Sequence, residues 1–258
     1  MSVGSALIII ALVLGAIAFL SALGWARERR GAEKWFGRAY HGMTAALLLA
    51  SVLLMAAILR HDFRYDYVVG YSSRDLPLLY LFSAFWGGQE GTYLLWALFA
   101  ALLGYGLFRR QGWQRAAVMA AYVPTILVLL LFMLNRQGNP FRLALPAPPD
   151  GRGLNQLLQD PWMATHPPIV FLGYSAMTIP AVLAWAAIFR RDERSWCAPA
   201  LRWTLVGFVT LGVGIIRGGV GAYKVLGWGG CWGWDPVENA SLIPWIVSAA
   251  LIHGLLVQ

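Results

Sequence analysis

The sequence predicts an all-α fold, a polytopic transmembrane helical bundle of about seven spans. Hydrophobic residues make up 59% of the 258 positions and charged residues only 12%, whereas a soluble domain averages about 25% charged residues. Several apolar runs reach the roughly 20 residues that a helix needs to cross a bilayer. Spans in lipid must be helices here, because each backbone polar group needs an internal partner. We expect residues 1–258 to form a single integral membrane domain.

The individual spans follow from the apolar runs in order. The first run, Ala6 to Trp25, is interpreted as a retained span, since no basic residue precedes it and it is too long for a signal peptide. The third run is longer than one span needs, so its helix is expected to begin near Gly91 after a shallow approach segment. The predicted spans cover residues 5–25, 41–59, 78–108, 116–134, 166–189, 203–223 and 242–258.

The basic residues indicate the orientation. The segments after the first, third and fifth spans hold 12 of the 20 basic residues and four of the 12 acidic ones, so the formal charge of +8 lies on one side. By the positive-inside rule that side is cytoplasmic and the N-terminus is periplasmic. Topology therefore explains the charge, and no nucleic-acid partner is expected. The 12 residues are Arg27, Arg29, Arg30, Lys34, Arg38, Arg109, Arg110, Arg115, Arg190, Arg191, Arg194 and Arg202.

A tryptophan-rich segment at residues 223–241 faces the periplasm in this topology. Three tryptophans fall within seven residues and alternate with glycines. Glycine lets a backbone approach a flat partner, and tryptophan supplies wide apolar faces. The pattern predicts a surface for a large planar, partly apolar ligand, although an interfacial aromatic belt is the alternative. The residues concerned are Trp228, Gly229, Gly230, Trp232 and Trp234.

The end of this segment carries two acids. Asp235 precedes Pro236, and Glu238 stands three residues after Asp235. This spacing is typical of a helix N-cap with proline in the first turn and an acid at the third position. An acid–base pair on one helix face is the alternative. No general base could be named, so the catalytic residues are unknown.

Two of the four histidines are candidate ligands. His166 precedes Pro167 and Pro168, which are expected to open the fifth helix and fix the imidazole at its head. Neutral imidazole is a common metal ligand and binds haem iron axially. His253 lies within the seventh span, where an ionisable side chain indicates function, the alternative being a neutral histidine bonded to a neighbouring helix.

Three cations near the outer edge could bind carboxylates such as propionates, and anchoring to lipid headgroups is an equal alternative. These cations are Arg74, Arg217 and Lys224. His41 is interpreted as a polar residue at the membrane interface, and His61 as a solvated residue of an outer loop.

Four motifs together resemble the N-terminal part of the CcmF-type cytochrome c haem lyase family, whose members share the tryptophan-rich WWD signature with other haem-handling membrane proteins. These motifs lie at Tyr71 to Leu78, Phe85 to Gly91, Leu157 to Tyr174 with its His-Pro-Pro, and Gly227 to Ser241. The resemblance implies a multi-pass protein of the bacterial inner membrane whose functional loops face the periplasm.

The resemblance also implies function and partners. Such proteins accept haem from a haem-chaperone protein and join its vinyl groups to apocytochrome c, together with a thiol-reducing factor and other maturation membrane subunits. Haem b is then both the substrate and a resident cofactor. His253 matches an axial iron ligand of the substrate haem, and His166 matches the histidine associated with the resident b haem. The tryptophan-rich segment, through Asp235, matches the haem platform.

The chain departs from the family pattern in two respects. Cys231 and Gly233 stand where aromatic residues are usual, and the family's partner histidines lie beyond residue 258. We therefore expect the chain to be the N-terminal part of a longer protein, a lyase subunit by resemblance that needs further spans or partner chains. The alternatives are a haem transporter or exporter component without ligase chemistry, and a non-catalytic truncated scaffold.

Overall fold

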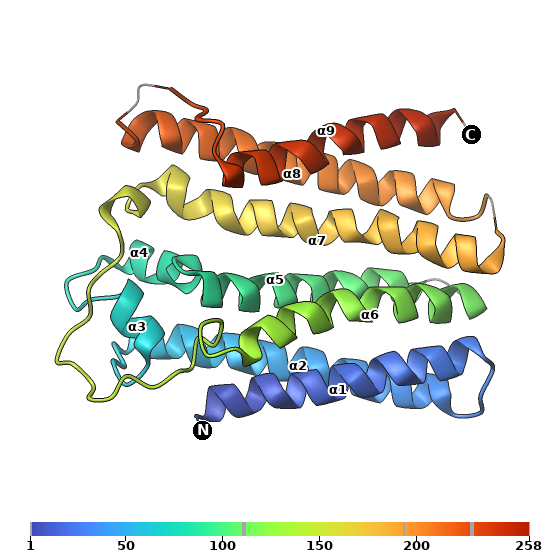
Figure 1. Cartoon of the computed structure of the whole chain (residues 1–258), viewed down its shortest axis with the longest axis horizontal. Helices are drawn as coiled ribbons and strands as arrows, with labels where there is room; N and C mark the ends of the chain where they lie inside the picture. The colour runs from blue at the N-terminus through green and yellow to red at the C-terminus, as the bar shows by residue number, and fades with distance from the viewer. Residues whose placement is uncertain (1, 110–111, 193, 228–229, 258) are drawn as a thin grey trace. The chain divides into compact units, whose positions relative to one another are not determined.

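The computed structural model describes residues 2–109, 112–192, 194–227 and 230–257. These residues form helices, and their only β-type pairing is an isolated antiparallel bridge between Tyr65 and Leu143. Seven of the described helices are long and apolar enough to cross a membrane, which confirms the predicted all-α bundle (Figure 1). The chain divides into two compact units, Met1–Gln159 and Asp160–Gln258. The single membrane domain over 1–258 stays a prediction.

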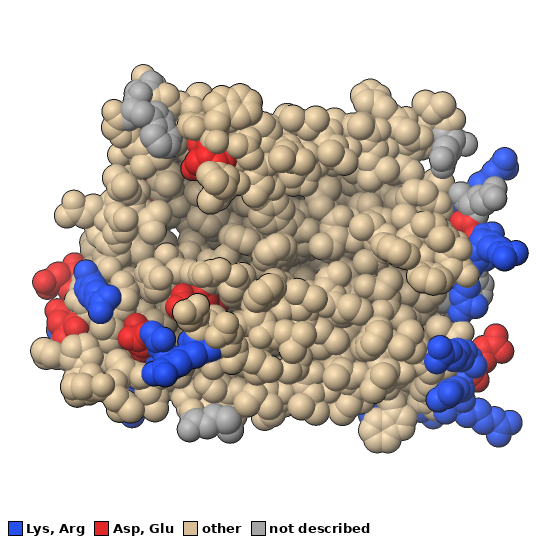
Figure 2. Space-filling view, viewed as in Figure 1, with Lys and Arg blue, Asp and Glu red and all other residues tan. Residues whose placement is uncertain are grey.

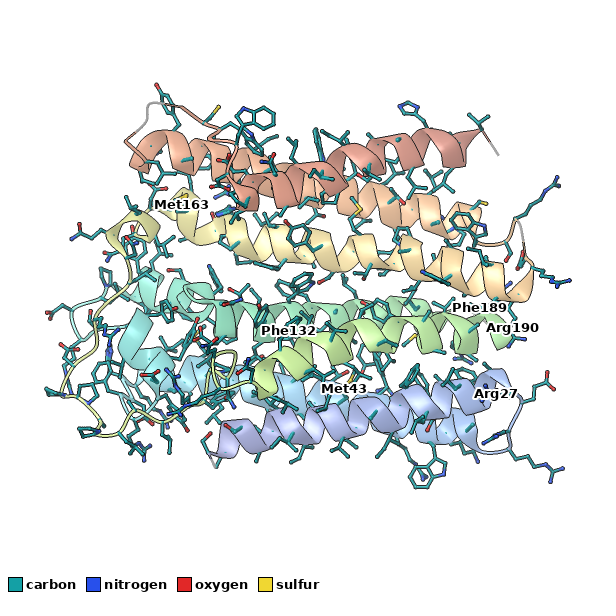
Figure 3. The ribbon with its side chains drawn as sticks, viewed as in Figure 1. Arg27, Met43, Phe132, Met163, Phe189 and Arg190 are labelled. Carbon is teal, nitrogen blue, oxygen red and sulfur yellow. The ribbon has the colours of Figure 1, made fainter. Side chains whose placement is uncertain are left out.

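Four long helices build the first unit. α1 (Val3–Ala26) packs against α2 (Ala32–Leu59) and α6 (Gly112–Leu134), and α5 (Gln89–Gly104) packs against α2 and α6. Met43 of α2 is fully buried in this core (Figure 3). The packing of apolar faces between these helices therefore supplies the core of the unit.

The third predicted span is interrupted as expected. Its helix begins at Gln89, after Gly87 and Gly88, and short helices precede it. The Tyr67 hydroxyl donates to the carbonyl oxygens of Ala84 and Phe85, at 3.0 and 2.8 Å. Burial raises the pKa of Tyr67 well above its ordinary value, which keeps the hydroxyl protonated as a donor. The short helices of this unit are α3 (Asp66–Tyr71), α4 (Leu78–Ser83), η1 (Ala84–Trp86), η2 (Tyr105–Arg109) and η3 (Gln156–Leu158).

Three long helices build the second unit. α8 (Cys197–Val225) packs against α7 (Pro161–Arg190) and α9 (Pro236–Leu256). A Cβ atom at Gly173 of α7 would lie 2.9 Å from the Leu211 backbone of α8, so only glycine permits this approach. On the other side of α8, Trp245 donates from Nε1 to the Phe208 carbonyl at 3.0 Å and stacks on the Phe208 ring. These contacts fix the three helices side by side.

The predicted start of the fifth span was wrong. α7 begins at Pro161, because the Asp160 side chain accepts hydrogen bonds from the backbone N–H groups of Trp162 and Met163, at 2.8 and 3.3 Å. Pro161 therefore takes the first-turn position that the sequence had suggested for Pro167. His166 lies inside the helix and not at its head. α2, α8 and α9 likewise begin earlier than predicted, at Ala32, Cys197 and Pro236.

On the face that Figure 2 shows, most charged side chains gather near the ends of the helices and few lie along the middle of the helices. Arg27 after α1 and Arg190 at the end of α7 are examples (Figure 3). Large apolar side chains are exposed on the flanks, as expected for helices that face lipid. They include Ile10, Val13 and Ile17 of α1 and Val206, Val209 and Val213 of α8.

Candidate functional site

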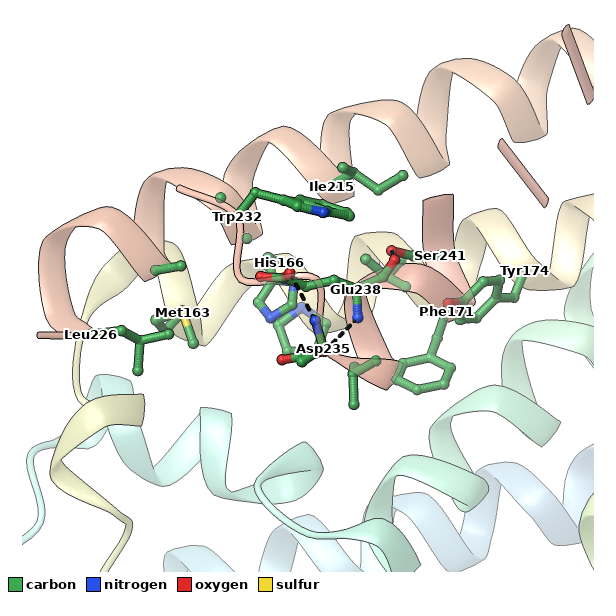
Figure 4. A pocket seen from close by; sticks show the side chains of 16 residues that line it. Met163, His166, Phe171, Tyr174, Ile215, Leu226, Trp232, Asp235, Glu238 and Ser241 are labelled. Carbon is green, nitrogen blue, oxygen red and sulfur yellow. Dashed lines mark hydrogen bonds between the residues drawn. The ribbon is translucent and has the colours of Figure 1, made fainter. Parts of the chain in front are cut away.

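The second unit contains a pocket of about 300 Å³ between α7, α8 and the segment that leads into α9 (Figure 4). We call it the α7–α9 pocket. Its volume lies at the lower end of the range of small-molecule sites, roughly 300–1,000 Å³. Apolar side chains dominate its walls, and a few polar groups converge on it. Its lining includes Met163, His166, Val170, Phe171, Tyr174, Ile215, Gly218, Gly219, Trp232, Asp235, Glu238 and Ser241.

His166 is the only histidine among the described residues that line the pocket. Its Nδ1 atom is buried without a hydrogen-bond partner. A Cβ atom at Gly218 would lie 3.1 Å from Nδ1, so the glycine of α8 makes room for the ring. Because Nδ1 is buried against Gly218, Nε2 is the ring nitrogen left for a ligand.

Trp232 forms the opposite part of the wall (Figure 4). Its Nε1 atom is also buried without a hydrogen-bond partner. Trp234 meets it edge to face at 6.0 Å between ring centroids, but Trp234 is 69% exposed and does not line the pocket. Gly230 does not line it either, and Trp228 and Gly229 lie outside the described residues. Among the described tryptophans of the predicted platform, Trp232 lines the pocket and Trp234 does not.

The start of α9 confirms the predicted helix cap. The Asp235 carboxylate accepts from the Glu238 N–H at 2.8 Å, and Glu238 Oε2 accepts from the N–H groups of Gly233 and Asp235, at 2.8 and 3.4 Å. Pro236 occupies the first turn. Both carboxylates at the pocket therefore hold the backbone of the tryptophan-rich segment through the hydrogen bonds of the cap.

His253 does not line the α7–α9 pocket. It lies 12 residues beyond Ser241 on α9, which corresponds to about 18 Å along the helix axis. Its side chain is exposed. The structure therefore does not bring the two predicted iron ligands together at one site.

The three cations expected to bind carboxylates differ in their surroundings. Arg74, in the first unit, donates from its backbone N–H to Asp150 and from Nε to the Pro149 carbonyl. Arg217 and Lys224 of α8 both face the Trp162 ring of α7. Arg217 directly precedes Gly218 of the pocket wall.

Sequence reasoning missed several residues of this site, among them Gly218 and Met163, which line the pocket. A Cβ atom at Gly219 would also lie 3.0 Å from the Cys231 carbonyl oxygen, so small residues on α8 let the tryptophan-rich segment approach. The stretch Gly218-Gly219-Val220-Gly221-Ala222, with three glycines and an alanine, was the available signal. No group of three or more potential metal-ligating side chains occurs within the described part of the chain.

Comparison with known proteins places the chain in a family. The profile described as "Cytochrome C assembly protein" matches residues 86–258. The chain is 42% identical over 239 residues to the cytochrome c-type biogenesis protein CcmF of Pseudomonas aeruginosa, covering 88% of this chain and 36% of that protein. It is 39% identical over 216 residues to the probable cytochrome c-type biogenesis protein NrfE of Escherichia coli, covering 82% of this chain and 39% of that protein.

A solved structure agrees with these relatives. The structure titled "Cytochrome c Heme Lyase CcmF" superposes with a TM-score of 0.84 at 29% identity, covering 98% of this chain and 41% of the other. The chain thus spans little more than a third of the length of the relatives it matches. With its seven apolar helices and the matched region that contains the α7–α9 pocket, the chain belongs to the cytochrome c assembly protein family.

Proposed function

We propose that the chain acts in cytochrome c biogenesis by binding haem in the α7–α9 pocket, as part of a haem lyase assembly. The observation that carries this proposal is the pairing of His166 with Trp232 across an apolar pocket. Imidazole is an axial ligand of haem iron, and an indole offers an apolar face to the macrocycle. The names of the relatives, which refer to cytochrome c biogenesis and a haem lyase, point the same way.

Haem fits the chemistry of this pocket. The walls are mainly apolar, and the buried Nε1 of Trp232 is a donor without a partner among the described residues. A buried donor of this kind costs free energy until a ligand group satisfies it. At about 300 Å³ the pocket holds part of a porphyrin ring, so one edge of the ring stays accessible for chemistry. We infer that an apocytochrome reaches the vinyl groups of the haem from that edge.

The positions of the histidines favour an exchange of the roles that the family resemblance suggested. We propose that His166 ligates the substrate haem, because it faces the same pocket as Trp232. His253 is then the ligand of a resident haem b further along α9, since its exposed imidazole lies outside the pocket. The second axial ligand of each haem comes from outside the described residues in this proposal.

Thioether formation adds a cysteine S–H across a vinyl double bond, and the chain contributes orientation to this step. Holding reactants in the right geometry can supply several kcal/mol of the barrier reduction. The carboxylates of Asp235 and Glu238 serve in the helix cap and thereby shape the segment that carries Trp232. We propose that a haem chaperone, apocytochrome c, its thiol-reducing factor and other membrane subunits meet at this pocket on the periplasmic side of the inner membrane.

Haem titration of the detergent-purified protein tests this proposal. The Soret band of added ferric haem should shift on binding to the wild type. His166→Ala should weaken binding tenfold or more, equal to about 1.4 kcal/mol. His253→Ala should leave this binding event unchanged and serves as the matched histidine control. Unaltered affinity in His166→Ala, with His253→Ala abolishing the Soret shift, contradicts the proposed assignment.

A further inference from the structure

The side chain of Arg217 is held rigidly outside the lining of the α7–α9 pocket, and Arg217 directly precedes Gly218 of the pocket wall. Its Nε and Nη2 atoms donate to the Thr165 hydroxyl oxygen, at 3.2 and 2.5 Å. The guanidinium carbon lies 4.6 Å from the centroid of the Trp162 ring. Thr165 in turn donates to the Pro161 carbonyl at 2.6 Å, which fixes its hydroxyl. The first turns of α7 therefore set both the position and the plane of the guanidinium group.

This positive charge has no ion-pair partner among the described residues. The ion pairs of that part of the chain join Arg64 to Asp62, Arg115 to Glu33 and Arg142 to Asp66. A charge within a membrane-spanning helix is costly and normally pairs with another group or marks a functional path. Arg217 lies in such a helix, α8, and is half-buried. Its charge therefore indicates an anionic group that is supplied by a ligand.

The charges around the pocket are arranged by sign. Arg217 and Lys224 gather at the Trp162 ring, with Lys224 Nζ 5.7 Å from its centroid. Asp235 and Glu238 lie at the start of α9, where they form the helix cap. The two cations at the Trp162 ring therefore attract an anionic edge of a ligand, and the two acids at the start of α9 repel it. When the anionic edge lies at the Trp162 side, the opposite, uncharged edge of the ligand is left toward the acids.

The guanidinium retains unused donors in a suitable geometry. Of its five N–H groups, two are taken by Thr165. The remaining N–H groups on Nη1 and Nη2 form the fork that binds a carboxylate in bidentate fashion. Gly218, which follows Arg217, leaves space for the His166 ring, and Thr165, which holds the guanidinium, directly precedes His166. A carboxylate bound here therefore lies close to the proposed iron ligand.

We propose that Arg217, positioned by Thr165 and Trp162, binds a propionate carboxylate of the porphyrin and so fixes the rotation of the haem in the α7–α9 pocket. The vinyl edge then lies away from Trp162. This inference deepens the proposed function and rests on it. Arg217 acts here as a residue that sets substrate orientation, separately from iron ligation by His166.

The test compares iron protoporphyrin IX with its dimethyl ester, in which both propionates are uncharged. The protein is studied in uncharged detergent by Soret titration. The wild type should bind the diacid about tenfold more tightly than the diester, as expected for one charged hydrogen-bonded contact. Arg217→Gln should lose this preference and still show the spectrum of a histidine-ligated haem. Arg217→Lys should retain part of the preference.

Two further variants keep the result decisive. Arg202→Gln removes an exposed charge from the same helix, and its preference should equal that of the wild type. Thr165→Val removes the hydroxyl that holds the guanidinium while keeping the shape of the side chain, and should lower the preference even if Arg217→Gln fails to fold.

The possible outcomes separate the two proposals. If Arg217→Gln and Thr165→Val keep the wild-type preference while His166→Ala loses haem, the orientation proposal is wrong and the proposed function stands. If Arg217→Gln changes only the retention of phosphatidylglycerol by the purified protein, Arg217 is a lipid anchor and the proposal is overturned. If the wild type binds neither porphyrin, the proposed function fails and the inference fails with it.

Discussion

At the scale of single residues, the cap at Asp235 determines how the tryptophan-rich segment ends. The Asp235 carboxylate accepts a hydrogen bond from the Glu238 N–H. The Glu238 carboxylate in turn accepts from the N–H groups of Gly233 and Asp235. Trp234 lies between Gly233 and Asp235 and has a φ of 57°, in the left-handed region that non-glycine residues rarely adopt. The reciprocal hydrogen bonds therefore hold a backbone that would otherwise relax, and Trp232 depends on that backbone for its place at the pocket.

Removing this cap should loosen the start of α9. Asp235→Ala should cost about 1 kcal/mol, so hydrogen exchange of the amides at 238–240 should accelerate about fivefold. Haem affinity should fall with it, because Trp232 loses its fixed position. Asp235→Asn is the matched control, since asparagine caps helices equally well. Faster exchange in Asp235→Asn as well would show that the charge, and not the cap, stabilises the helix start.

The cap and the histidine contact differ in how far the sequence could predict them. Asp235 and Glu238 are three residues apart, so their hydrogen bonds depend on local geometry that the sequence already contains. The contact of His166 with Gly218 joins residues on two helices. It depends on how α7 and α8 pack, and no local pattern around His166 indicates the partner.

At the scale of the elements, the close contact of α7 and α8 sets the width of the pocket. A Cβ atom at Gly173 would lie 2.9 Å from the Cα, Cβ and N atoms of Leu211. Backbone atoms cannot rotate away, so Gly173→Ala should push the helices apart. Overpacking of this kind costs roughly 1–3 kcal/mol. The thermal midpoint of the purified protein should fall, and haem affinity should fall because His166 moves relative to α8.

Gly254→Ala provides the comparison for that variant. A Cβ atom there meets nothing within 4 Å, and the residue lies in helix α9. Since alanine favours helix over glycine by up to about 1 kcal/mol, its thermal midpoint should stay unchanged or rise. Equal losses in both variants would contradict the role assigned to the α7–α8 contact.

The helices themselves were predictable in number but less so in their ends. Hydropathy marked all seven apolar helices, because each must satisfy its backbone internally. The predicted start of α7 was too late, because the prolines at 167 and 168 suggested a first turn there. The helix begins at Pro161, where Asp160 caps it. Proline inside a helix is costly in water, but neighbouring helices can compensate for it in a membrane. Composition alone could not decide between these two starts.

At the scale of the whole molecule, function depends on which ends of the spans face the periplasm. The positive-inside rule places the α7–α8 connection in the cytoplasm and the tryptophan-rich segment outside. This orientation stays a prediction, and it is the condition on which access by a periplasmic partner rests. The chain contains two cysteines, Cys197 at the start of α8 and the exposed Cys231 after its end. A single helix separates them, so they should lie on opposite sides of the membrane.

Labelling of intact cells with a membrane-impermeant maleimide tests this orientation. Because Cys231 is exposed and predicted to be periplasmic, the wild type and Cys197→Ser should be labelled, whereas Cys231→Ser should not. Permeabilised cells treated with denaturant should label Cys197 in Cys231→Ser, which shows that this cysteine can react once it is reached. Labelling of Cys231→Ser but not of Cys197→Ser in intact cells would reverse the orientation. The α7–α9 pocket would then open to the cytoplasm, where haem delivery and attachment in the periplasm could not take place.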